Sequence, residues 1–382
     1  MVGLAYKFVI EMKKKILYIA FPPIIEGNGV SKKILAQRDA FKENGHEVVL
    51  CHFVDENGKK YAYLDQNKFF CMGGRILYHI KIYIFFRRLS MHVKKTGYNG
   101  IYIRYDKNAS AGFIHFLKSI EGFSKRIMEI PTYPYDSEVH NASLYRRLRL
   151  WEEKHYREKF RFCVDYMVTF TDDTTIFGVK TLKISNAVDD RTICLRKRYD
   201  SKEFEYSFIG VANLAFWHGF DRILYGLKNY YASGGKNKII FRIVGDGNAA
   251  ERTRLKKIVE DEKLTDKVIF YSNMSGKELD DLFDISNFAI GCLGCHRKQI
   301  TTVKSLKNVE YAMRGIPFIY SEINDDFDGK PYILKATPDE APIDINIIID
   351  FIKNFVYSPS DIRQDVSHLT WEKQMKIVGG YF

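Results

Sequence analysis

Short apolar runs alternate with helical patterns along the chain, most regularly over residues 200–325. The clearest apolar runs are Tyr206–Val211, Ile239–Val244 and Phe288–Leu293. Each is nearly continuous in apolar residues, which is typical of a parallel strand buried on both faces. Amphipathic patterns such as Phe220–Tyr231 lie between them and predict helices. Repeated strand–helix units of this kind predict an α/β fold built on doubly wound parallel sheets.

The first half of the chain repeats this alternation, more weakly over residues 55–100. We predict a strand over Lys15–Ala20, then a helix that ends near Asn44, then a strand over Glu47–Phe53. A length of 382 residues suits two packed cores better than one. The sequence therefore predicts two Rossmann-like domains that face each other across a cleft, one over residues 1–190 and one over residues 200–365.

The two halves differ in charge. The chain holds 59 Lys and Arg against 47 Asp and Glu, a net charge of +12. Residues 1–190 contain 31 basic and 21 acidic side chains and so carry +10, which leaves +2 for the rest. A basic first half indicates an anionic partner, which can be nucleic acid, a phosphorylated substrate or a membrane surface. Solubility alone is the alternative explanation.

Six cysteines are too few for a disulfide scaffold in a chain of this length. Cys292 and Cys295 have C-x2-C spacing, but no second Cys or His pair follows at zinc-finger distance, and His296 alone cannot complete a set. We interpret the pair as a buried strand that reaches a loop, and we assign no metal ligand. No apolar run approaches the roughly 18 residues of a membrane span, and the first residues do not read as a signal peptide, so we expect a cytoplasmic protein.

Three stretches of the second half occur in a specific order: Phe208–Leu214 with Trp217–Arg222, then Ile243–Gly247 (IVGDG), then Ser305–Pro317 (SLKNVEYAMRGIP). This order resembles the donor-binding domain of family 4 retaining glycosyltransferases with the GT-B fold, across roughly residues 205–325. The first half resembles the acceptor domain of that family more loosely, through residues 27–29 and Ile184–Asp189. Glu129–Asp136 and Gly294–Lys298 are similar to a bacterial subgroup linked to the assembly of surface polysaccharide.

The resemblance implies a retaining hexosyltransferase that takes a nucleoside-diphosphate sugar, with a UDP-sugar favoured. Its acceptor would be a saccharide or a lipid-linked intermediate of capsule, exopolysaccharide or lipopolysaccharide assembly. The family needs no metal cofactor. The segment from Trp371 resembles its final helix, so we expect residues 366–382 to pack back on the first domain.

The predicted donor site begins at Ser305, Leu306 and Lys307, which open a helix. Free backbone N–H groups and the positive end of the helix dipole suit a diphosphate, and Lys307 can reach the same phosphates unless it is an ordinary surface lysine. In the resembled family, the residue that matches Glu310 binds the ribose hydroxyls. Gly245 and Gly247 form a tight loop expected to line the base or the phosphates.

The sequence departs from the family at the first of two paired glutamates, because Thr302 stands eight residues before Glu310. Thr301 and Thr302 can still form hydrogen bonds to the donor hexose. Arg297 and Lys298, beside His296, are predicted to oppose the charge of the leaving phosphate, although an exposed basic loop explains them as well. Further predicted phosphate contacts are His218, in place of a family lysine, and Arg297, in place of a family arginine.

Acceptor-side candidates lie where predicted strands of the first half end, since crevices form there in such sheets. They are Gly27, Asn28, Gly29, Arg104, Asp106, Glu129, Tyr133 and Asp136. A simple strand–helix turn and a packed aromatic loop are the competing interpretations. No histidine occupies the place of the family's acceptor-domain histidine, so none is assigned a catalytic role.

Two basic amphipathic segments, Leu77–Lys95 and Leu144–Phe162, can lie on an anionic bilayer, or can simply cover a sheet. The alternatives to a transferase are a nucleotide-sugar isomerase or hydrolase on the same fold, and a catalytically degenerate homologue. A basic nucleic-acid-binding protein is the least favoured, because the chain contains no recognition motif for it.

Overall fold

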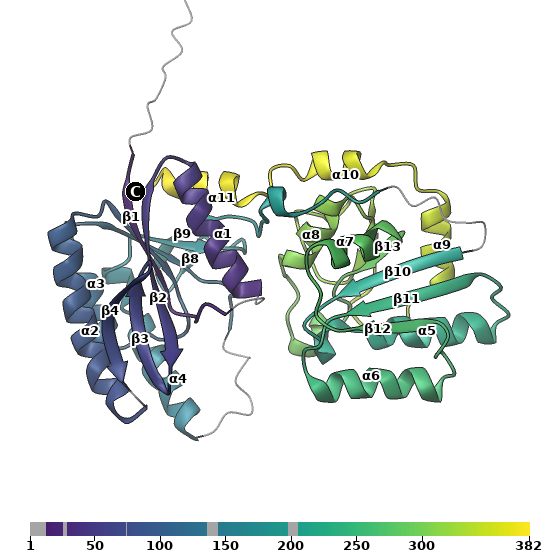
Figure 1. The fold of residues 1–382 in the computed structure, drawn as a ribbon, viewed down its shortest axis with the longest axis horizontal. Helices are drawn as coiled ribbons and strands as arrows, with labels where there is room; N and C mark the ends of the chain where they lie inside the picture. Colours follow the sequence, from purple (N-terminus) through teal and green to yellow (C-terminus); the bar gives the residue numbers. More distant parts are fainter. Residues whose placement is uncertain (1–12, 26–28, 74, 136–143, 198–204) are drawn as a thin grey trace, which may run out of the picture. The chain divides into compact units, whose positions relative to one another are not determined.

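The structure is a computed structural model that describes residues 13–25, 29–73, 75–135, 144–197 and 205–382 (Figure 1). The chain divides into two compact units. Unit 1 contains residues 1–134, 139–184 and 371–382, and unit 2 contains residues 135–138 and 185–370. The last helix, α11 (Trp371–Gly379), therefore belongs to unit 1, where it packs against α1 (Gly29–Glu43).

Unit 1 is built on a nine-stranded sheet in the order β4-β3-β2-β1-β5-β6-β7-β9-β8. Its strands are β1 (Lys15–Ala20), β2 (Glu47–Glu56), β3 (Lys59–Leu64), β4 (Asn67–Gly73), β5 (Gly100–Arg104), β6 (Lys125–Glu129), β7 (Tyr166–Thr169), β8 (Thr175–Ile176) and β9 (Val179–Lys183). The pairs from β2 through β1, β5, β6 and β7 to β9 are parallel, and β3, β4 and β8 add antiparallel edges. The other helices of this unit are α2 (Arg75–Thr96), α3 (Ala111–Ser119), α4 (Leu144–Arg157) and the 3₁₀ turn η2 (Phe160–Phe162).

The weak alternation over residues 55–100 corresponds to a hairpin and a long helix rather than to strand–helix units. Asn57 and Gly58 join β2 to β3 with φ angles of 50° and 74°. Positive φ at both central residues is the signature of the tight hairpin turn that matches strand twist. The hairpin thus extends the parallel sheet by two antiparallel edge strands.

Unit 2 has a six-stranded sheet in the order β12-β11-β10-β13-β14-β15, and its pairs are all parallel. The strands are β10 (Glu205–Val211), β11 (Lys238–Val244), β12 (Val268–Tyr271), β13 (Phe288–Ile290), β14 (Phe318–Tyr320) and β15 (Ile333–Lys335). The helices are α5 (Phe220–Ala232), α6 (Ala249–Asp261), α7 (Lys277–Asp284), α8 (Leu306–Arg314), α9 (Ile345–Lys353) and α10 (Pro359–Asp365), with 3₁₀ turns η3 (Asp190–Thr192), η4 (Phe216–His218) and η5 (Cys295–Lys298).

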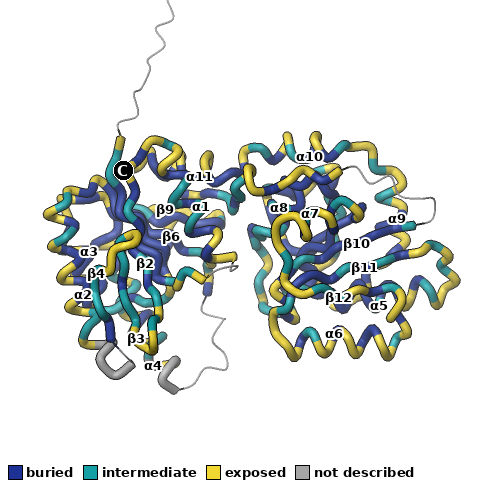
Figure 2. The backbone as a smooth tube through the Cα atoms, in the orientation of Figure 1, coloured by how far each residue is buried: buried dark blue, intermediate teal, exposed yellow. Residues whose placement is uncertain are grey.

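Both faces of the unit 2 sheet are covered. Phe208 and Ile209, neighbours in β10, belong to two different hydrophobic clusters, as expected when successive side chains point to opposite faces. The dark central strands in Figure 2 show this double burial. The predicted fold class, two Rossmann-like α/β sheets, is confirmed. Among the described residues, every helix is too short or too polar to cross a bilayer.

The order of strands in unit 2 also locates a crevice. The chain runs from β10 outward to β11 and β12, then returns to the opposite side of β10 to form β13. In open α/β sheets, ligands bind outside the carboxyl ends of strands at such a reversal. The loops after β10 and β13 are therefore the first place to look for a site.

Candidate functional site

The loops that follow β10 and β13 are in direct contact. Leu293 donates its backbone N–H to the carbonyl oxygen of His218 at 2.9 Å, and the Cys292 thiol lies 2.9 Å from the carbonyl oxygen of Trp217. The Lys298 ammonium lies 4.5 Å from the centre of the Trp217 ring. The structure thus brings together the two segments that hold His218 and Lys298, which are 80 residues apart in the numbering.

Glycines in these loops are needed for backbone packing. Gly245 has a φ of +126°, and a Cβ there would lie 1.9 Å from the carbonyl oxygen of Ala212. Gly247 has a φ of +65°, and its Cβ would lie 2.0 Å from the backbone nitrogen of Leu214. The predicted ligand-lining role of both glycines remains a prediction, whereas the contact between their loop and the loop after β10 is sufficient to require them.

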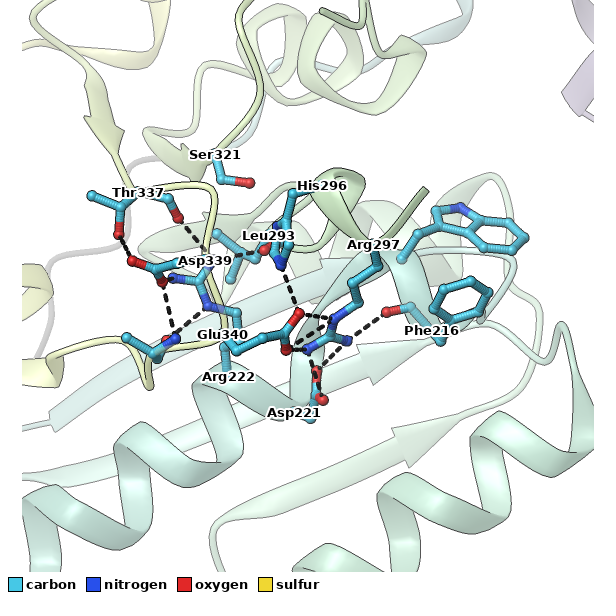
Figure 3. A network of polar contacts seen from close by, with 12 residues as sticks. Phe216, Asp221, Arg222, Leu293, His296, Arg297, Ser321, Thr337, Asp339 and Glu340 are labelled. Carbon is cyan, nitrogen blue, oxygen red and sulfur yellow. Dashed lines mark hydrogen bonds and ion pairs between the residues drawn. The ribbon is translucent and has the colours of Figure 1, made fainter. Parts of the chain in front are cut away.

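Arg297 is held by polar contacts to other residues of unit 2 (Figure 3). Its guanidinium donates to both carboxylate oxygens of Asp221 at 3.0 Å, to Glu340 at 2.9 and 3.1 Å, and to the carbonyl oxygen of Phe216 at 2.6 Å. Only 13% of the side chain is exposed. This differs from the predicted phosphate contact, because two carboxylates already neutralise the charge and occupy the donors.

Two neighbouring side chains are also engaged. His296 contacts Glu340 through Nε2 at 2.6 Å, and buried Arg222 donates to the carbonyl oxygen of Leu293 at 2.6 Å and to Asp339 at 2.8 Å (Figure 3). These bonds hold the loop after β13 to residues 337–341. Lys298, which stacks on an aromatic ring, is the cation of this loop best placed to meet an added anion.

His218 is a neutral hydrogen-bond donor. Its Nδ1 accepts a hydrogen bond from the backbone N–H of Ala215 at 3.1 Å, so Nε2 carries the proton. Burial, and after it the positive charge of Lys307, lowers the pKa of His218 to about 2. The imidazole can therefore donate to a phosphate oxygen but cannot supply the charge of the lysine that it was predicted to replace.

The start of α8 provides backbone donors. Ser305 is the N-cap residue in an extended conformation, and its carbonyl oxygen accepts from Asn308 and Val309 at 3.2 and 3.4 Å. The N–H groups of Leu306 and Lys307 precede the first bonded turn, so the helix itself offers them no acceptor. Together with the helix dipole, they form a site suited to a phosphate.

The Lys307 side chain turns away from this role. Its ammonium is buried without a hydrogen-bond partner among the described residues and lies 5.7 Å from the centre of the Phe220 ring. Burial lowers its pKa, while the thiols of Cys292 and Cys295 and the Glu322 carboxyl act in the opposite direction. The phosphate contact of this side chain stays a prediction, whereas the backbone N–H of Lys307 already lies at the start of the helix.

Glu310 lies one turn further along α8. Its Oε1 accepts two bonds of 3.2 Å from Arg314, which also binds Asp280, and 31% of the side chain is exposed. A half-exposed carboxylate held in place by an arginine keeps surface for a diol ligand. Thr301 is exposed, and Thr302 forms a parallel bridge with Ile323, which fixes the loop before α8.

In unit 1, Glu129 is fully buried and saturated. It accepts from Tyr102 and Gln37 at 2.7 Å, from Lys33 at 3.1 Å and from Arg104. Burial alone would raise the pKa of Glu129, but Lys33 and Arg104 overcome it and lower the pKa to about 2. The acceptor contacts of Glu129 and Arg104 stay a prediction, and in this structure both side chains belong to a buried ion-pair cluster.

The other described acceptor candidates follow the carboxyl ends of three neighbouring parallel strands, β1, β5 and β6. Asp106 is exposed just after β5, Tyr133 packs edge-to-face on Phe177 with ring centres 5.8 Å apart, and Gly29 starts α1, where a Cβ would meet no atom within 4 Å. Gly27, Asn28 and Asp136 lie outside the described residues. The acceptor role of these residues stays a prediction.

The sequence did not predict a pocket of about 370 Å³ that lies between the loop after β10 and the start of α6. Its lining residues are Asn213, Leu214, Ala215, Phe216, Trp217, Asn248, Ala250, Glu251 and Arg254. The last three belong to α6, and residues within a helix carry no strand-end signal that could have indicated them. The pocket is next to the crevice, so it is a candidate for the part of a ligand that extends beyond the phosphates.

Two doubly wound α/β units with largely parallel sheets are the architecture of glycosyltransferases with the GT-B fold. The chain is similar to a glycosyltransferase from Rickettsia africae ESF-5, with a TM-score of 0.68 and 11% identity over 95% of this chain and 96% of that one. It is also similar to a sucrose-phosphate synthase from Thermosynechococcus elongatus, with a TM-score of 0.64 and 14% identity over 97% and 98%.

A third similar structure is the Anabaena protein HepE in complex with UDP, with a TM-score of 0.62 and 10% identity over 97% of this chain and 98% of that one. No family model and no curated protein matches the sequence. Identities this low show a shared fold, and the fold is the GT-B fold.

Proposed function

We propose that the protein transfers a sugar from a nucleoside diphosphate donor to a hydroxyl group of an acceptor, with retention of configuration. The observation that carries this proposal is the start of α8. Two backbone N–H groups start this helix, and a half-exposed glutamate lies one turn later. In a nucleoside diphosphate the diphosphate is joined to the ribose, so the first group can bind the diphosphate while the second binds the ribose. Two similar structures, HepE and a pneumococcal O-GlcNAc transferase, are complexes with UDP, which favours a UDP-sugar here.

In this proposal, the N–H groups of Leu306 and Lys307 bind the diphosphate, and Glu310 binds the ribose. The Nε2–H of His218 and the Lys298 ammonium contact the departing phosphate, while Thr301 and Thr302 contact the hexose. These side chains and backbone groups oppose the developing charge without a metal ion.

We further propose that the acceptor is a saccharide or a lipid-linked saccharide and that unit 1 meets a membrane surface. The outer face of α2 carries exposed apolar side chains beside exposed basic ones, and the helix contains no acidic residue. The exposed residues are Ile80, Tyr83, Ile84, Arg87, Arg88, Met91, Lys94 and Lys95. Apolar and basic groups on one stripe suit an anionic bilayer. A lipopolysaccharide galactosyltransferase among the similar structures is consistent with this class of acceptor.

The test is a panel of UDP-, GDP-, ADP- and dTDP-sugars incubated with the full chain, with and without a mixture of saccharide and lipid-linked saccharide acceptors, with acceptor-dependent release of the nucleoside diphosphate as the readout. We expect one base to be used, and Glu310→Ala to lower its turnover about 10- to 100-fold, since a charged hydrogen-bond partner of the ribose is lost. Glu278→Ala, which removes an exposed glutamate of α7, is the control.

Release that needs no acceptor would favour a nucleotide-sugar hydrolase, and conversion of the sugar without release would favour an isomerase. No release and no conversion with any donor would reject the transferase.

A further inference from the structure

Two thiols and a carboxyl group meet where β13 and β14 end. Cys292 follows β13 by two residues, Cys295 opens η5, and Glu322 follows β14 by two residues. One ligand atom from each lies within 4.8 Å of the others, and the two sulfur atoms are 3.1 Å apart. All three residues are buried, with exposed fractions of 5%, 8% and 2%.

Polar atoms around these groups lack partners. Oε2 of Glu322, Nζ of Lys307 and Oδ1 of Asn308 are buried and form no hydrogen bond with any described residue. The other carboxylate oxygen of Glu322 has a single weak contact, 3.4 Å from the Asn308 amide nitrogen. Buried polar groups are nearly always satisfied, so a carboxyl group held this way beside two thiols points to a ligand rather than to packing.

We propose that Cys292, Cys295 and Glu322 bind a zinc ion in unit 2, with a water molecule as the fourth ligand. Thiolate sulfur with one carboxylate oxygen is a donor set that zinc accepts, while magnesium and calcium prefer oxygen alone. Tetrahedral zinc separates its ligands by roughly 3.5–4 Å, given Zn–S and Zn–O bonds of about 2.3 and 2.1 Å. The observed group needs only a small opening of the two sulfurs to reach that geometry.

Lys307 completes the charge balance. Two thiolates and a carboxylate carry three negative charges, zinc carries two positive charges, and the Lys307 ammonium supplies the third. The ammonium has no hydrogen-bond partner among the described residues, and in this proposal it turns to a metal-bound sulfur, the kind of contact that orients and tunes ligands. Zinc binding displaces the protons of the two thiols, so the bound cluster is neutral inside the protein.

The ion would join neighbouring strand ends beside the start of α8. Ser321 already donates its N–H to the carbonyl oxygen of Cys292 at 2.9 Å, and Lys307 and Asn308 reach the cluster from the first turn of α8. A zinc ion there would brace the loop over residues 291–305 from inside unit 2. This role does not depend on the proposed transferase activity, so the two can fail separately.

The test uses the full chain, prepared with a thiol reductant and dialysed against trace zinc, with zinc measured by elemental mass spectrometry. We expect one zinc ion per chain, and a thiolate-to-cobalt charge-transfer band when Co²⁺ replaces it. Cys292→Ser, Cys295→Ser and Glu322→Gln should each weaken zinc binding at least 10-fold. Lys307→Met should weaken it about 10- to 100-fold but keep the band at saturating metal. Cys163→Ser, a buried thiol of unit 1, should bind zinc as the wild type does.

Folded wild-type chain with no bound zinc and no charge-transfer band would overturn the proposal, as would zinc that is unaffected by the two cysteine substitutions. A disulfide between Cys292 and Cys295 in the reduced preparation would also overturn it, in favour of a redox pair. If the variants fail to fold, the cobalt spectrum of the wild type decides. A second measurement is peptide mapping of alkylated cysteines, in which bound zinc should protect Cys292 and Cys295.

Discussion

Lys33 is a buried charged residue of unit 1. It shares the Glu129 carboxylate with Arg104, so two cations surround one buried anion. The Lys33 ammonium also lies 4.0 Å from the centre of the Phe170 ring and 5.0 Å from that of Trp371. Burial lowers the pKa of Lys33 to about 7, although Glu129 raises it, so its charge is costly at neutral pH.

We predict that the stability of unit 1 rises with pH between about 7 and 10.5. In this window, the unfolded chain keeps a proton on Lys33 while the folded chain has lost it, so raising the pH favours the folded state. From pH 7 to pH 9, the free energy of unfolding of wild type should gain about 1–2 kcal/mol relative to Lys33→Met. Urea unfolding at both pH values measures this.

Lys32→Met is the matched control, because Lys32 is exposed next to Lys33. It should follow the wild-type pH dependence. A Lys33→Met chain with the same pH dependence as wild type would show that Lys33 does not titrate in this window.

The sequence identified charged residues at strand ends but not their partners. Glu129 was predicted to face an acceptor, yet Gln37 binds it from 92 positions away. Arg297 was predicted to meet phosphate, yet Asp221 and Glu340 hold it. Charge and position in a strand are local properties, whereas neutralisation by a distant carboxylate depends on packing, which one sequence does not reveal. Predictions that rest on a helix start, such as Leu306, use local backbone geometry and are less exposed to this error.

At the scale of the elements, the turn after β11 requires glycine at position 245. We predict that Gly245→Ala destabilises unit 2 by more than about 3 kcal/mol, since its Cβ would meet the carbonyl oxygen of Ala212 in a backbone conformation reserved for glycine. Gly234→Ala, at a position that follows α5 with a φ of +87° and open space, should cost only about 1–2 kcal/mol. Thermal unfolding compares the two. Equal costs would mean that the turn relaxes and that contact with Ala212 is unimportant.

Helix α2 provides a second prediction at this scale. Its exposed apolar and basic stripe should bind vesicles that contain phosphatidylglycerol more strongly than vesicles of phosphatidylcholine alone. The double substitution Arg87→Glu with Arg88→Glu should lower the bound fraction in co-sedimentation at least 10-fold, with a dependence on salt.

The charge-matched control is Lys256→Glu with Lys257→Glu, on the exposed face of α6 in unit 2. If both double variants lose binding equally, net charge rather than the α2 stripe attracts the vesicles.

For the whole molecule, the alternation of apolar runs and amphipathic segments was enough to predict two Rossmann-like sheets. It worked best in unit 2, where β10 is buried on both faces and stands out as a continuous apolar run. It failed for the β3–β4 hairpin, whose strands are half-buried edges with mixed composition. It also missed β15, a three-residue edge strand too short to show a period. Burial on both faces leaves a strong trace in the sequence, and an edge leaves little.

The two halves of the chain also differ in net charge. Residues 1–190 carry +10, while the rest of the chain, which contains the proposed nucleotide site, carries +2. Backbone N–H groups at the start of α8 need few added cations to hold a diphosphate. We propose that the surplus serves a different anionic partner, either a membrane surface or a lipid diphosphate.

The most direct test of the central claim is calorimetric titration of the full chain with UDP, GDP, ADP and dTDP. We predict saturable binding of one of these nucleotides. Glu310→Ala should weaken this binding about 10- to 100-fold, and Glu278→Ala should leave it unchanged. Binding of none, or binding that Glu310→Ala leaves intact, would contradict a nucleotide site at the start of α8.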